Sequence, residues 1–523
     1  MKTITFRSEA TPRFLSAAKL MSDAVGATLG PNGRTVILER PDAPIATKDG
    51  VTVAKAVHAD DKLSNLCIQL IRDAAHEAVQ ECGDGTTTTT ILTEAIFSEG
   101  AKMVAAGSHP IKLKSGVQLG VDYCVSQLRK AAQSINDTDT EERLEQVATI
   151  SSNGDVGLGS TIANVIVEVG SGGVVQVEEG TGIETEWSIE SGISIPKGYS
   201  SSYFANRDGV CELTDALVLV TDAKLQHASQ ILKLLERVYV GKHGLLIVAE
   251  EIIGEALACL TVNAVRKGMK LCAVKAPGVG DRRQAWFEDI AMSTGTRVYS
   301  PKHGAELDNL PLDLLGKATK IKVTDTDTVI RGGQAFPNEM ASYVKKLYNQ
   351  LEQLPKYDRE MMQERIAMLS GGIGLIKVGA HTEVELIERK ARLEDALSAT
   401  HAALEEGVLP GGGVAYAKCI SGLERLARMH KGEKRMGILL LCKALQAPLR
   451  RLSSNAGLEP GENIPMTRNL GKDKAWCART NQFGNMFELG VLDPAKVTRV
   501  ALQKAASVAM TLLTTEAAVY RAE

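Results

Sequence analysis

Apolar residues recur at helical spacing in both terminal parts of the chain. This spacing predicts four long helices, at Arg13–Ala27, Leu63–Gln80, Glu383–Glu406 and Lys496–Tyr520. Gly407 follows the third helix and is a candidate C-terminal cap. Asp493 and Pro494 precede the fourth, in the order expected of an N-cap followed by proline at the first helical position.

The middle of the chain has a different pattern. Short β-branched or Leu-rich runs predict strands, and helical stretches at Ser229–Tyr239 and Gly254–Lys267 lie between them. The predicted strands are Gly173–Glu178, Leu217–Thr221, Gly244–Ala249 and Leu271–Lys275. Alternating strands and helices predict an α/β domain inserted into a helical one. Gly192 and Gly371–Gly372 are hinge candidates, because glycine tolerates backbone angles closed to other residues.

Length and charge narrow the class of protein. A chain of 523 residues exceeds the size of a single hydrophobic core, so several domains are expected. Lys and Arg total 60 against 63 for Asp and Glu, which gives no electrostatic footprint for nucleic acid. No apolar run reaches about 18 residues, so no membrane partner is expected. The N-terminal stretch lacks a secretory apolar region, which predicts a cytoplasmic protein.

The cysteines do not form a recognisable metal or disulfide pattern. There are nine, an odd number, scattered along the chain without a CxxC pair. This distribution favours buried free thiols in a reducing compartment over a disulfide framework or a zinc site.

Three glycine-containing segments are candidates for phosphate binding, although the chain has neither GxxxxGK[ST] nor a strand-associated GxGxxG. Thr28–Gly33 follows a helix and predicts a nest of backbone N–H groups. Gly83–Thr90 precedes an apolar run, so its threonines would lie at a helix N-terminus, which favours anions. Asp84 would repel phosphate there unless a cation such as Mg²⁺ lay between them. Gly411–Gly413 is a third loop that permits close approach.

Each segment also has a structural interpretation. Thr28–Gly33 is also compatible with a simple helix-to-strand turn, Asp84 with an N-cap, and the threonine run with an ordinary β-branched stretch. Asp395 lies in the middle of a predicted helix, where aspartate is a poor helix former. A position on the solvated face is its alternative interpretation.

Taken together and in this order, nine longer stretches resemble the GroEL family of group I chaperonins. The resemblance runs from about Thr11 to Tyr520. The stretches are ATLGPNGRTVILE, TKDGVTVAK, GDGTTTTTILTEAI, EVGSGGVVQVEEGTG, LLIVAEEIIGEALACL, VKAPGVGDRR, SGGIGLIKVGAHTEVE, LEDALSATHAALEEGVLPGGGVA and GVLDPAKVTR.

The resemblance implies a mixed α and α/β multidomain chaperonin fold. A helical equatorial ATP-binding domain would comprise residues 1–133 and 406–523, an intermediate hinge domain 134–190 and 373–405, and an α/β apical domain 191–372. The implied activity is ATP hydrolysis coupled to the capture and folding of unfolded polypeptides inside a chamber. The implied partners are copies of the chain in stacked seven-membered rings and a GroES-type co-chaperonin.

The resemblance also assigns roles at the nucleotide. Asp395 matches the carboxylate that orients the attacking water, Asp49 one that supports hydrolysis, and Asp84 the magnesium ligand. The implied cofactors are ATP and Mg²⁺, with K⁺ as a candidate further cation. The remaining nucleotide contacts would be Thr28, Leu29, Gly30, Pro31, Lys48, Gly85, Thr86, Thr87, Thr88, Gly412 and Asp493.

The resemblance implies an apical groove for unfolded chains, and several departures suggest a divergent paralogue. Ser200 replaces the leucine that is usual in the family, and Thr261 replaces the usual valine. Cys477-Ala478-Arg479 replaces the Asn-Ala-Ala that family members commonly place against the adenine. The sequence also ends at Glu523 without a Gly-Met-rich tail. A binding or scaffold protein with weak or no ATPase activity is the alternative. The expected groove residues are Tyr199, Tyr203, Phe204, Leu232, Leu235, Leu257 and Val262.

Overall fold

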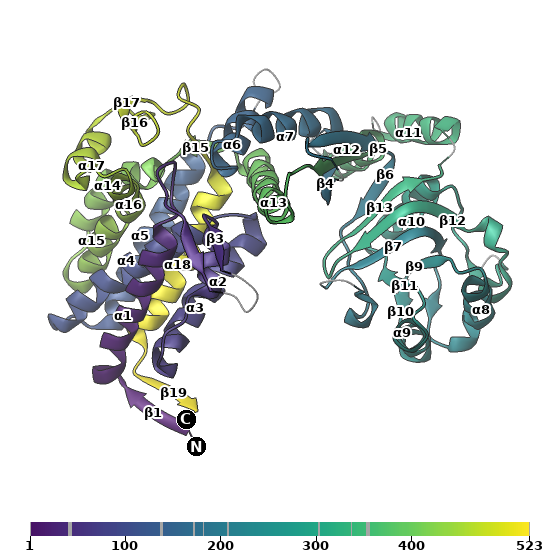
Figure 1. Ribbon diagram of the computed structural model, residues 1–523, viewed down its shortest axis with the longest axis horizontal. Coiled ribbons are helices and arrows are strands. Elements are labelled where there is room, and N and C mark those ends of the chain that lie inside the picture. The colour runs from purple at the N-terminus through teal and green to yellow at the C-terminus, as the bar shows by residue number, and fades with distance from the viewer. Residues whose placement is uncertain are drawn as a thin grey trace. The chain divides into compact units, whose positions relative to one another are not determined.

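A computed structural model gives the fold for most of the chain. It describes residues 2–39, 44–135, 140–170, 173–180, 182–206, 209–301, 304–335, 337–351 and 356–521. The chain divides into two compact units, drawn in Figure 1. Unit 1 comprises Met1–Asn164 and Thr382–Glu523, and unit 2 comprises Val165–His381. The terminal parts of the sequence therefore fold together around an inserted middle part.

Unit 1 is built mainly of helices packed side by side. The central ones are rich in alanine, and their small side chains allow close approach, as where α18 packs against α3, α4 and α5. The helices are α1 (Arg7–Gly26), α2 (Gly50–Ala56), α3 (Lys62–Cys82), α4 (Thr86–Ala105), α5 (Pro110–Ala131), α6 (Thr140–Ser151), α13 (Glu383–Glu406), α14 (Val414–Arg428), α15 (Gly432–Ala444), α16 (Ala447–Asn455), α17 (Pro460–Asn469) and α18 (Ala495–Thr514). A further helix, α7 (Val156–Val169), crosses the division between the units.

Short antiparallel strand pairs connect the helices of unit 1. One pair joins the two ends of the chain, with Lys2 opposite Arg521 and Phe6 opposite Ala517. The pairs are β1 (Lys2–Phe6) with β19 (Ala517–Arg521), β2 (Val36–Leu38) with β3 (Ile45–Thr47), β15 (Val408–Pro410) with β18 (Leu492–Pro494), and β16 (Lys474–Cys477) with β17 (Gln482–Asn485).

Two expectations for the last helix are wrong. The helix ends at Thr514, and Tyr520 lies in β19, because alternating residues there pair with β1 instead of continuing the helical stripe. Asp493 is not the N-cap: it lies in β18, and Pro494 itself is the extended residue before the helix. Pairing with β15 holds Asp493 opposite Leu409.

Unit 2 contains a six-stranded sheet with the order β11-β9-β7-β12-β13-β6. Strands β7, β9 and β11 are parallel and the remaining neighbours antiparallel. The strands of this sheet are β6 (Gly192–Ile195), β7 (Cys211–Val220), β9 (Gly244–Ala249), β11 (Leu271–Lys275), β12 (Gly316–Val323) and β13 (Thr328–Gly333). The helices of unit 2 are α8 (Leu232–Val240), α9 (Gly254–Lys267), α10 (Asp281–Thr294), α11 (Pro337–Leu351) and α12 (Lys356–Gly371).

Two smaller sheets complete unit 2. Strand β14 (Ile373–Val378) lies between β4 (Val174–Glu179), to which it is parallel, and β5 (Glu186–Glu190), to which it is antiparallel. Strands β8 (Lys224–Leu225) and β10 (Glu251–Ile252) form a parallel pair. A helical part with an inserted α/β part is thus confirmed.

The hinge candidates and the cysteines have clear positions. Gly192 begins β6, and Gly372 takes a left-handed φ of +71° where α12 passes into β14.

All nine cysteines are free thiols, and only Cys259 is not buried. No helix in the described part of the chain is long and apolar enough to cross a membrane.

Candidate functional site

One cavity of unit 1, about 920 Å³ in volume, brings together all three glycine-containing segments. It is lined by every residue expected to contact the nucleotide or to take part in its hydrolysis. They are Thr28, Leu29, Gly30, Pro31, Lys48, Asp49, Asp84, Gly85, Thr86, Thr87, Thr88, Asp395, Gly412 and Asp493. These positions span the sequence from residue 28 to residue 493, so the fold and not chain proximity assembles the set.

The first segment is a tight turn after α1. Thr28 donates its hydroxyl to the carbonyl oxygen of Val25 at 2.8 Å, and the Gly33 N–H donates to the Gly30 oxygen at 2.9 Å. Gly30 has a φ of +81°. A Cβ at Gly33 would lie 2.1 Å from the Thr28 oxygen, so only glycine fits there. The turn therefore presents backbone to the cavity, as a phosphate nest requires.

The second segment forms the N-terminus of α4. Gly83 caps α3 with a φ of +74°, and Gly85, with a φ of +103°, precedes the first helical residue without a side-chain cap. Among the described residues, the buried hydroxyls of Thr86 and Thr89 have no hydrogen-bond partner. A 20-residue helix that begins with uncapped N–H groups favours an anion at that end.

The start of α2 lies close to these two segments. A Cβ at Gly50 would lie 2.2 Å from the Thr87 hydroxyl, so glycine is needed for α2 to approach α4. Asp49 is the N-cap of α2: its two carboxylate oxygens accept from the N–H groups of Val51 at 3.0 Å and Thr52 at 2.7 Å. Local bonds therefore fix the orientation of this carboxylate.

Asp84 faces the same space but does not cap α4. Its Oδ1 accepts from the N–H of Gly85 at 2.5 Å. Burial raises the pKa of Asp84, the Gly85 N–H lowers it, and the Asp49 carboxylate raises it further. The N-cap interpretation of Asp84 is therefore wrong, because Gly85 occupies that position.

Asp395 projects from the middle of α13 and is half-buried, so it does not lie on a solvated face. Burial raises its pKa to about 8, and the charges of Asp84, Asp49 and Glu394 raise it as well. Asp493 is a fourth acidic group, on β18. Burial and the charge of Asp84 raise its pKa to about 6, although hydrogen bonds from the backbone N–H groups of Gly413 and Gly412 act to lower it.

Within the described part of the chain, the main causes of the raised pKa values of Asp84, Asp395 and Asp493 are burial and neighbouring carboxylates, and no Lys or Arg side chain is among them. Lys48 and Arg392 line the same cavity. Among the described residues, no group of three or more His, Cys, Asp or Glu side chains would hold a metal ion by itself. The arrangement fits Mg²⁺ held by one carboxylate together with phosphate oxygens, which is how proteins commonly bind this ion.

Apolar side chains also line the cavity. They include Trp476, Met486 and Leu452, all at most 7% exposed. The lining continues past Trp476 with Cys477, at the end of β16, and with Ala478 and Arg479 in the turn before β17. Asn32, from the first segment, donates its side-chain N–H to the Ala478 carbonyl at 3.0 Å. Apolar side chains and an anion site thus line one cavity, a combination that suits a ligand with an apolar part and a charged part.

Sequence reasoning missed several lining residues. Ile150, Ser151, Asn153 and Gly154, at the end of α6 and in the turn after it, also line the cavity. Val384 and Ile387 of α13 also line it, about three and about two helical turns before Asp395. They are 71% and 61% exposed. Their helical spacing with Asp395 was the available signal, since residues 384, 387, 391 and 395 share one face.

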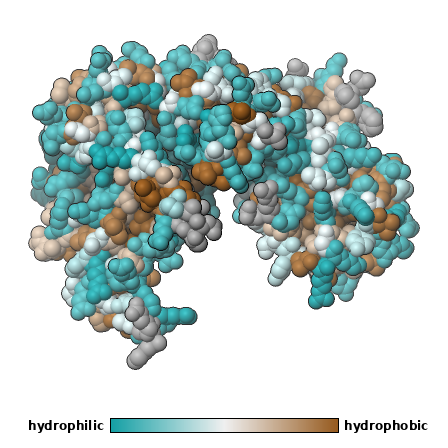
Figure 2. Space-filling model, viewed as in Figure 1, coloured by the Kyte–Doolittle hydropathy of each residue, from teal (hydrophilic) through white to brown (hydrophobic). Residues whose placement is uncertain are grey.

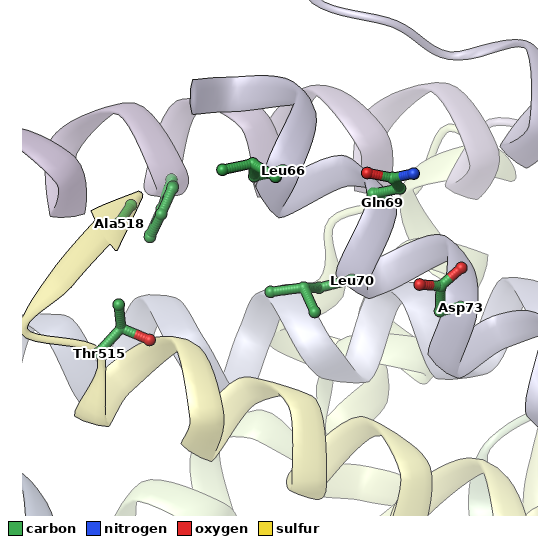
Figure 3. A pocket seen from close by; sticks show the side chains of 7 residues that line it. Leu66, Gln69, Leu70, Asp73, Thr515 and Ala518 are labelled. Atoms are coloured by element: carbon green, nitrogen blue, oxygen red, sulfur yellow. The ribbon is translucent and has the colours of Figure 1, made fainter. Parts of the chain in front are cut away.

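A second hollow in unit 1 is smaller, about 240 Å³, and lies near the chain ends. Figure 3 shows Leu66 and Leu70 of α3 extending toward the segment that carries Thr515 and Ala518. Asp73 is the only titratable group in its lining. The hollow therefore has no acid–base set and no anion site.

The expected groove residues of unit 2 fall into two groups. Tyr203, Leu232 and Val262 are 68%, 44% and 49% exposed. Leu235 and Phe204 are each only 3% exposed and belong to the hydrophobic core of the unit, so their expected surface position is wrong. For Leu235 the reason is that the buried stripe of α8 runs through Leu234, Leu235 and Val238 and excludes Leu232. Phe204 is the buried residue of the short 3-10 turn Ser202–Phe204. Tyr199 and Leu257 pack partly against the same core.

Exposed apolar side chains also occur in unit 1. On the face shown in Figure 2 they gather around the place where Figure 1 draws β2, β3 and α2. Ile37 of β2 is 75% exposed, and Phe6 and Val519 of the terminal strand pair are 62% and 54% exposed. Apolar surface of this kind is typical of sites of protein association.

Comparison with known proteins gives a consistent result. Residues 21–522 match the TCP-1/cpn60 chaperonin family. Two crystal forms of the chaperonin gp146 from the bacteriophage EL 2 (Pseudomonas aeruginosa), obtained in the presence of ATP-BeFx, have a similar fold at 23% sequence identity. Their TM-scores are 0.75 and 0.67, and each match covers 99% of this chain and 99% of the other. The chaperonin fold expected from the sequence is thereby confirmed.

Proposed function

The chain belongs to the TCP-1/cpn60 chaperonin family, and on that premise we propose that it is an ATP-hydrolysing chaperonin. It would capture unfolded polypeptides and promote their folding inside a ring chamber. The observation that carries the proposal is the cavity of unit 1, where uncapped helix N–H groups meet carboxyl groups whose pKa values are raised by burial. The presence of ATP-BeFx in the crystals of gp146 supports a nucleotide as the ligand.

The phosphates would bind at the N-terminus of α4. Thr86, Thr87 and Thr88 supply backbone N–H groups and hydroxyls there, and the orphaned Thr86 hydroxyl would gain a partner. The backbone of the turn at Thr28–Gly33 would also contact the phosphates. Lys48, an exposed side chain in the lining, would contribute positive charge.

Asp84 would hold Mg²⁺. When bound, the ion would supply the positive charge that lets phosphate oxygens lie beside the carboxylates. Among the described residues nothing distinguishes a site for K⁺, which stays a prediction from the family resemblance.

Asp395 would orient the attacking water and accept its proton. Its place in the lining of the cavity, half-buried on α13, supports this role, and a bound cation would favour its charged form. Asp49, held rigidly as the cap of α2, would fix the position of the water relative to the phosphate. Catalysis would then depend on placement and charge, without a covalent intermediate.

The remaining features follow the family. We propose the division into equatorial (1–133, 406–523), intermediate (134–190, 373–405) and apical (191–372) domains, and stacked seven-membered rings closed by a GroES-type partner. The exposed apolar side chains of Ile37, Phe6 and Val519 support self-association, and Tyr203, Leu232 and Val262 support capture of unfolded chains through apolar burial.

A binding or scaffold protein with weak or no ATPase activity is the second candidate. The observation that favours it is the turn Cys477-Ala478-Arg479, because the buried Cys477 replaces the asparagine side chain that the family presents to adenine. Release of phosphate from ATP by the purified protein, with and without a GroES-type partner, separates the two. Turnover that exceeds that of Asp395→Ala supports the chaperonin ATPase; equal, negligible rates support the scaffold.

A further inference from the structure

The ammonium group of Lys418, on α14, is held by the backbone of one segment, residues 467–474. It donates to four carbonyl oxygens, those of Thr467, Leu470 at 3.2 Å, Gly471 at 3.0 Å and Lys474 at 3.0 Å. An ammonium group has three N–H donors, so all of them have acceptors here. Burial lowers the pKa of Lys418 and the charge of Asp473 raises it, as expected of an ammonium group drawn into the protein.

The loop within this segment has little apolar burial to hold it. The residues between α17 and β16, 470–473, are all exposed or half-buried, so apolar packing contributes little to their placement. The Thr467 carbonyl belongs to the last turn of α17, where carbonyl oxygens lack partners within the helix. Lys418 therefore caps α17 and also fixes the loop that follows it.

The same segment is bonded to two residues of the cavity wall. The Trp476 N–H donates to Oγ1 of Thr467 at 3.3 Å, and the Met486 N–H donates to the carbonyl oxygen of Asp473 at 2.9 Å. Trp476 and Met486 line the cavity and are 2% and 1% exposed. Lys418 does not line the cavity, so it acts on this wall through the segment.

Helix α14 is itself anchored at the cavity. It begins directly after the glycine loop 411–413 and carries Tyr416, which also lines the cavity. The Tyr416 hydroxyl donates to the Thr498 carbonyl oxygen of α18 at 2.6 Å, and this bond is buried. Lys418 therefore joins a helix of fixed position to a loop that is bonded to another part of the wall.

We propose that Lys418 is a positioning residue for nucleotide binding. Its ammonium group fixes segment 467–474 and thereby the part of the cavity wall formed by Trp476 and Met486. The proposal rests on the proposed function, since it names a further residue on which the same site depends. It assigns no contact between Lys418 and the ligand.

This role predicts a loss of affinity without a loss of chemistry. The start of α4, Asp84 and Asp395 lie on other elements, so removal of the ammonium group displaces one wall and leaves the phosphate site and the carboxyl groups in place. Binding that is lost equally from the ground state and the transition state raises KM and leaves kcat unchanged.

The first test is steady-state ATP hydrolysis by the full-length protein in Mg²⁺. Lys418→Met removes the charge and keeps an unbranched side chain, Lys418→Arg keeps a cation with several donors, and Lys472→Met is the matched control at an exposed position of the same loop. KM for ATP should rise about tenfold in Lys418→Met, because charge-assisted hydrogen bonds are lost, while kcat stays unchanged. Lys418→Arg should restore most of the affinity, and Lys472→Met should equal wild type.

Trp476 gives a second readout that needs no nucleotide. The chain has three tryptophans, so Trp187→Phe together with Trp286→Phe leaves Trp476 as the single one. Trp476 is buried, so acrylamide should quench its fluorescence weakly. Addition of Lys418→Met to this background should raise the quenching constant about twofold or more, because the segment opens locally. Addition of Lys418→Arg or Lys472→Met should not.

Unchanged KM and unchanged quenching in Lys418→Met overturn the inference, and so does a fall in kcat at unchanged KM. Increased quenching with unchanged KM overturns the role in nucleotide binding. If the wild type does not hydrolyse ATP, the proposed function fails, and the quenching alone decides whether Lys418 holds the wall. The melting temperature of each variant reports folding. If Lys418→Met does not fold, Lys418→Gln replaces it and should change KM and quenching in the same direction by less.

Discussion

The nucleotide cavity of unit 1 and the expected groove of unit 2 differ in how their residues are specified. All fourteen residues expected at the nucleotide line one cavity. The seven residues expected in the groove divide between surface and core, with Tyr203 exposed and Leu235 buried. Glycines and carboxylates at the nucleotide also have structural uses, as Gly83 does at the end of α3 and Asp49 at the start of α2, but their order along the sequence matched the family's nucleotide loops. A leucine on an amphipathic helix has an obvious structural use, which is to fill the core.

The largest expected effect separates chemistry from binding in the cavity. Asp395→Ala should retain ATP binding but reduce phosphate release by about 10²- to 10⁴-fold, because it removes the base that positions water. Nucleotide affinity by calorimetry and phosphate release by a colorimetric assay are measured separately. Phosphate release equal to wild type would show that Asp395 has no part in hydrolysis.

Asp84→Lys should abolish magnesium-dependent nucleotide binding. The substitution replaces the proposed ligand of Mg²⁺ with a cation at the same point of the turn between α3 and α4. Calorimetry with ATP is performed with Mg²⁺ and with EDTA on both proteins. Tight binding of ATP to wild type in EDTA would contradict the assignment, since the carboxylates would then tolerate phosphate without an ion.

In unit 2, two leucines three residues apart should behave differently. Leu235→Ser should cost about 2–5 kcal/mol of stability, because the side chain is buried in the core. Leu232→Ser, at a position 44% exposed, should leave stability nearly unchanged and weaken capture of a denatured client. Denaturant unfolding and co-sedimentation with the client give the two readouts. Equal stability losses in both variants would show that Leu232 is core as well.

The pH dependence of stability should report Asp395. Its pKa is about 8 in the folded protein against a usual value of 3.8, so the folded state holds this proton more tightly. The stability of the nucleotide-free protein therefore falls as the pH rises from about 4 to about 8, and then levels. Asp395→Asn removes this penalty, and its advantage over wild type should grow to roughly 2–5 kcal/mol at pH 8.

Thermal unfolding in EDTA at pH 5, 7 and 8 measures that advantage. Asp60→Asn, at an exposed position outside the cavity, is the matched control. An advantage of Asp395→Asn that does not change with pH would mean that the carboxyl group is solvated and carries no raised pKa.

The smallest expected effect concerns the apolar surface of the groove. Restoring the family's residues with Ser200→Leu and Thr261→Val should strengthen client capture by about 1–3 kcal/mol in total, if both side chains become buried in the complex. In the present structure Thr261 donates its hydroxyl to the Leu257 carbonyl at 3.0 Å, so this helix face is partly polar. Capture that is unchanged in the double variant would place the client elsewhere.

The sequence predicted the helices and strands well where periodicity is long. Glu383–Glu406 and Gly254–Lys267 have the predicted bounds, and β9 and β11 do too. The end of α18 was not predictable from spacing, because pairing with the distant β1 converts residues 517–521 into a strand. The cavity was predictable from the family resemblance, but its wall at Asn153 and Gly154 was not. The Asn-Gly pair marks a turn without indicating which distant segments the turn will face.

The central claim is that the cavity of unit 1 is an ATPase site. The most direct measurement is phosphate release from ATP by the wild-type protein, in Mg²⁺ and in excess EDTA. The account predicts turnover in Mg²⁺ that EDTA abolishes, because Asp84 and the phosphates would share the ion. No turnover in Mg²⁺, or turnover that EDTA leaves unchanged, would contradict it.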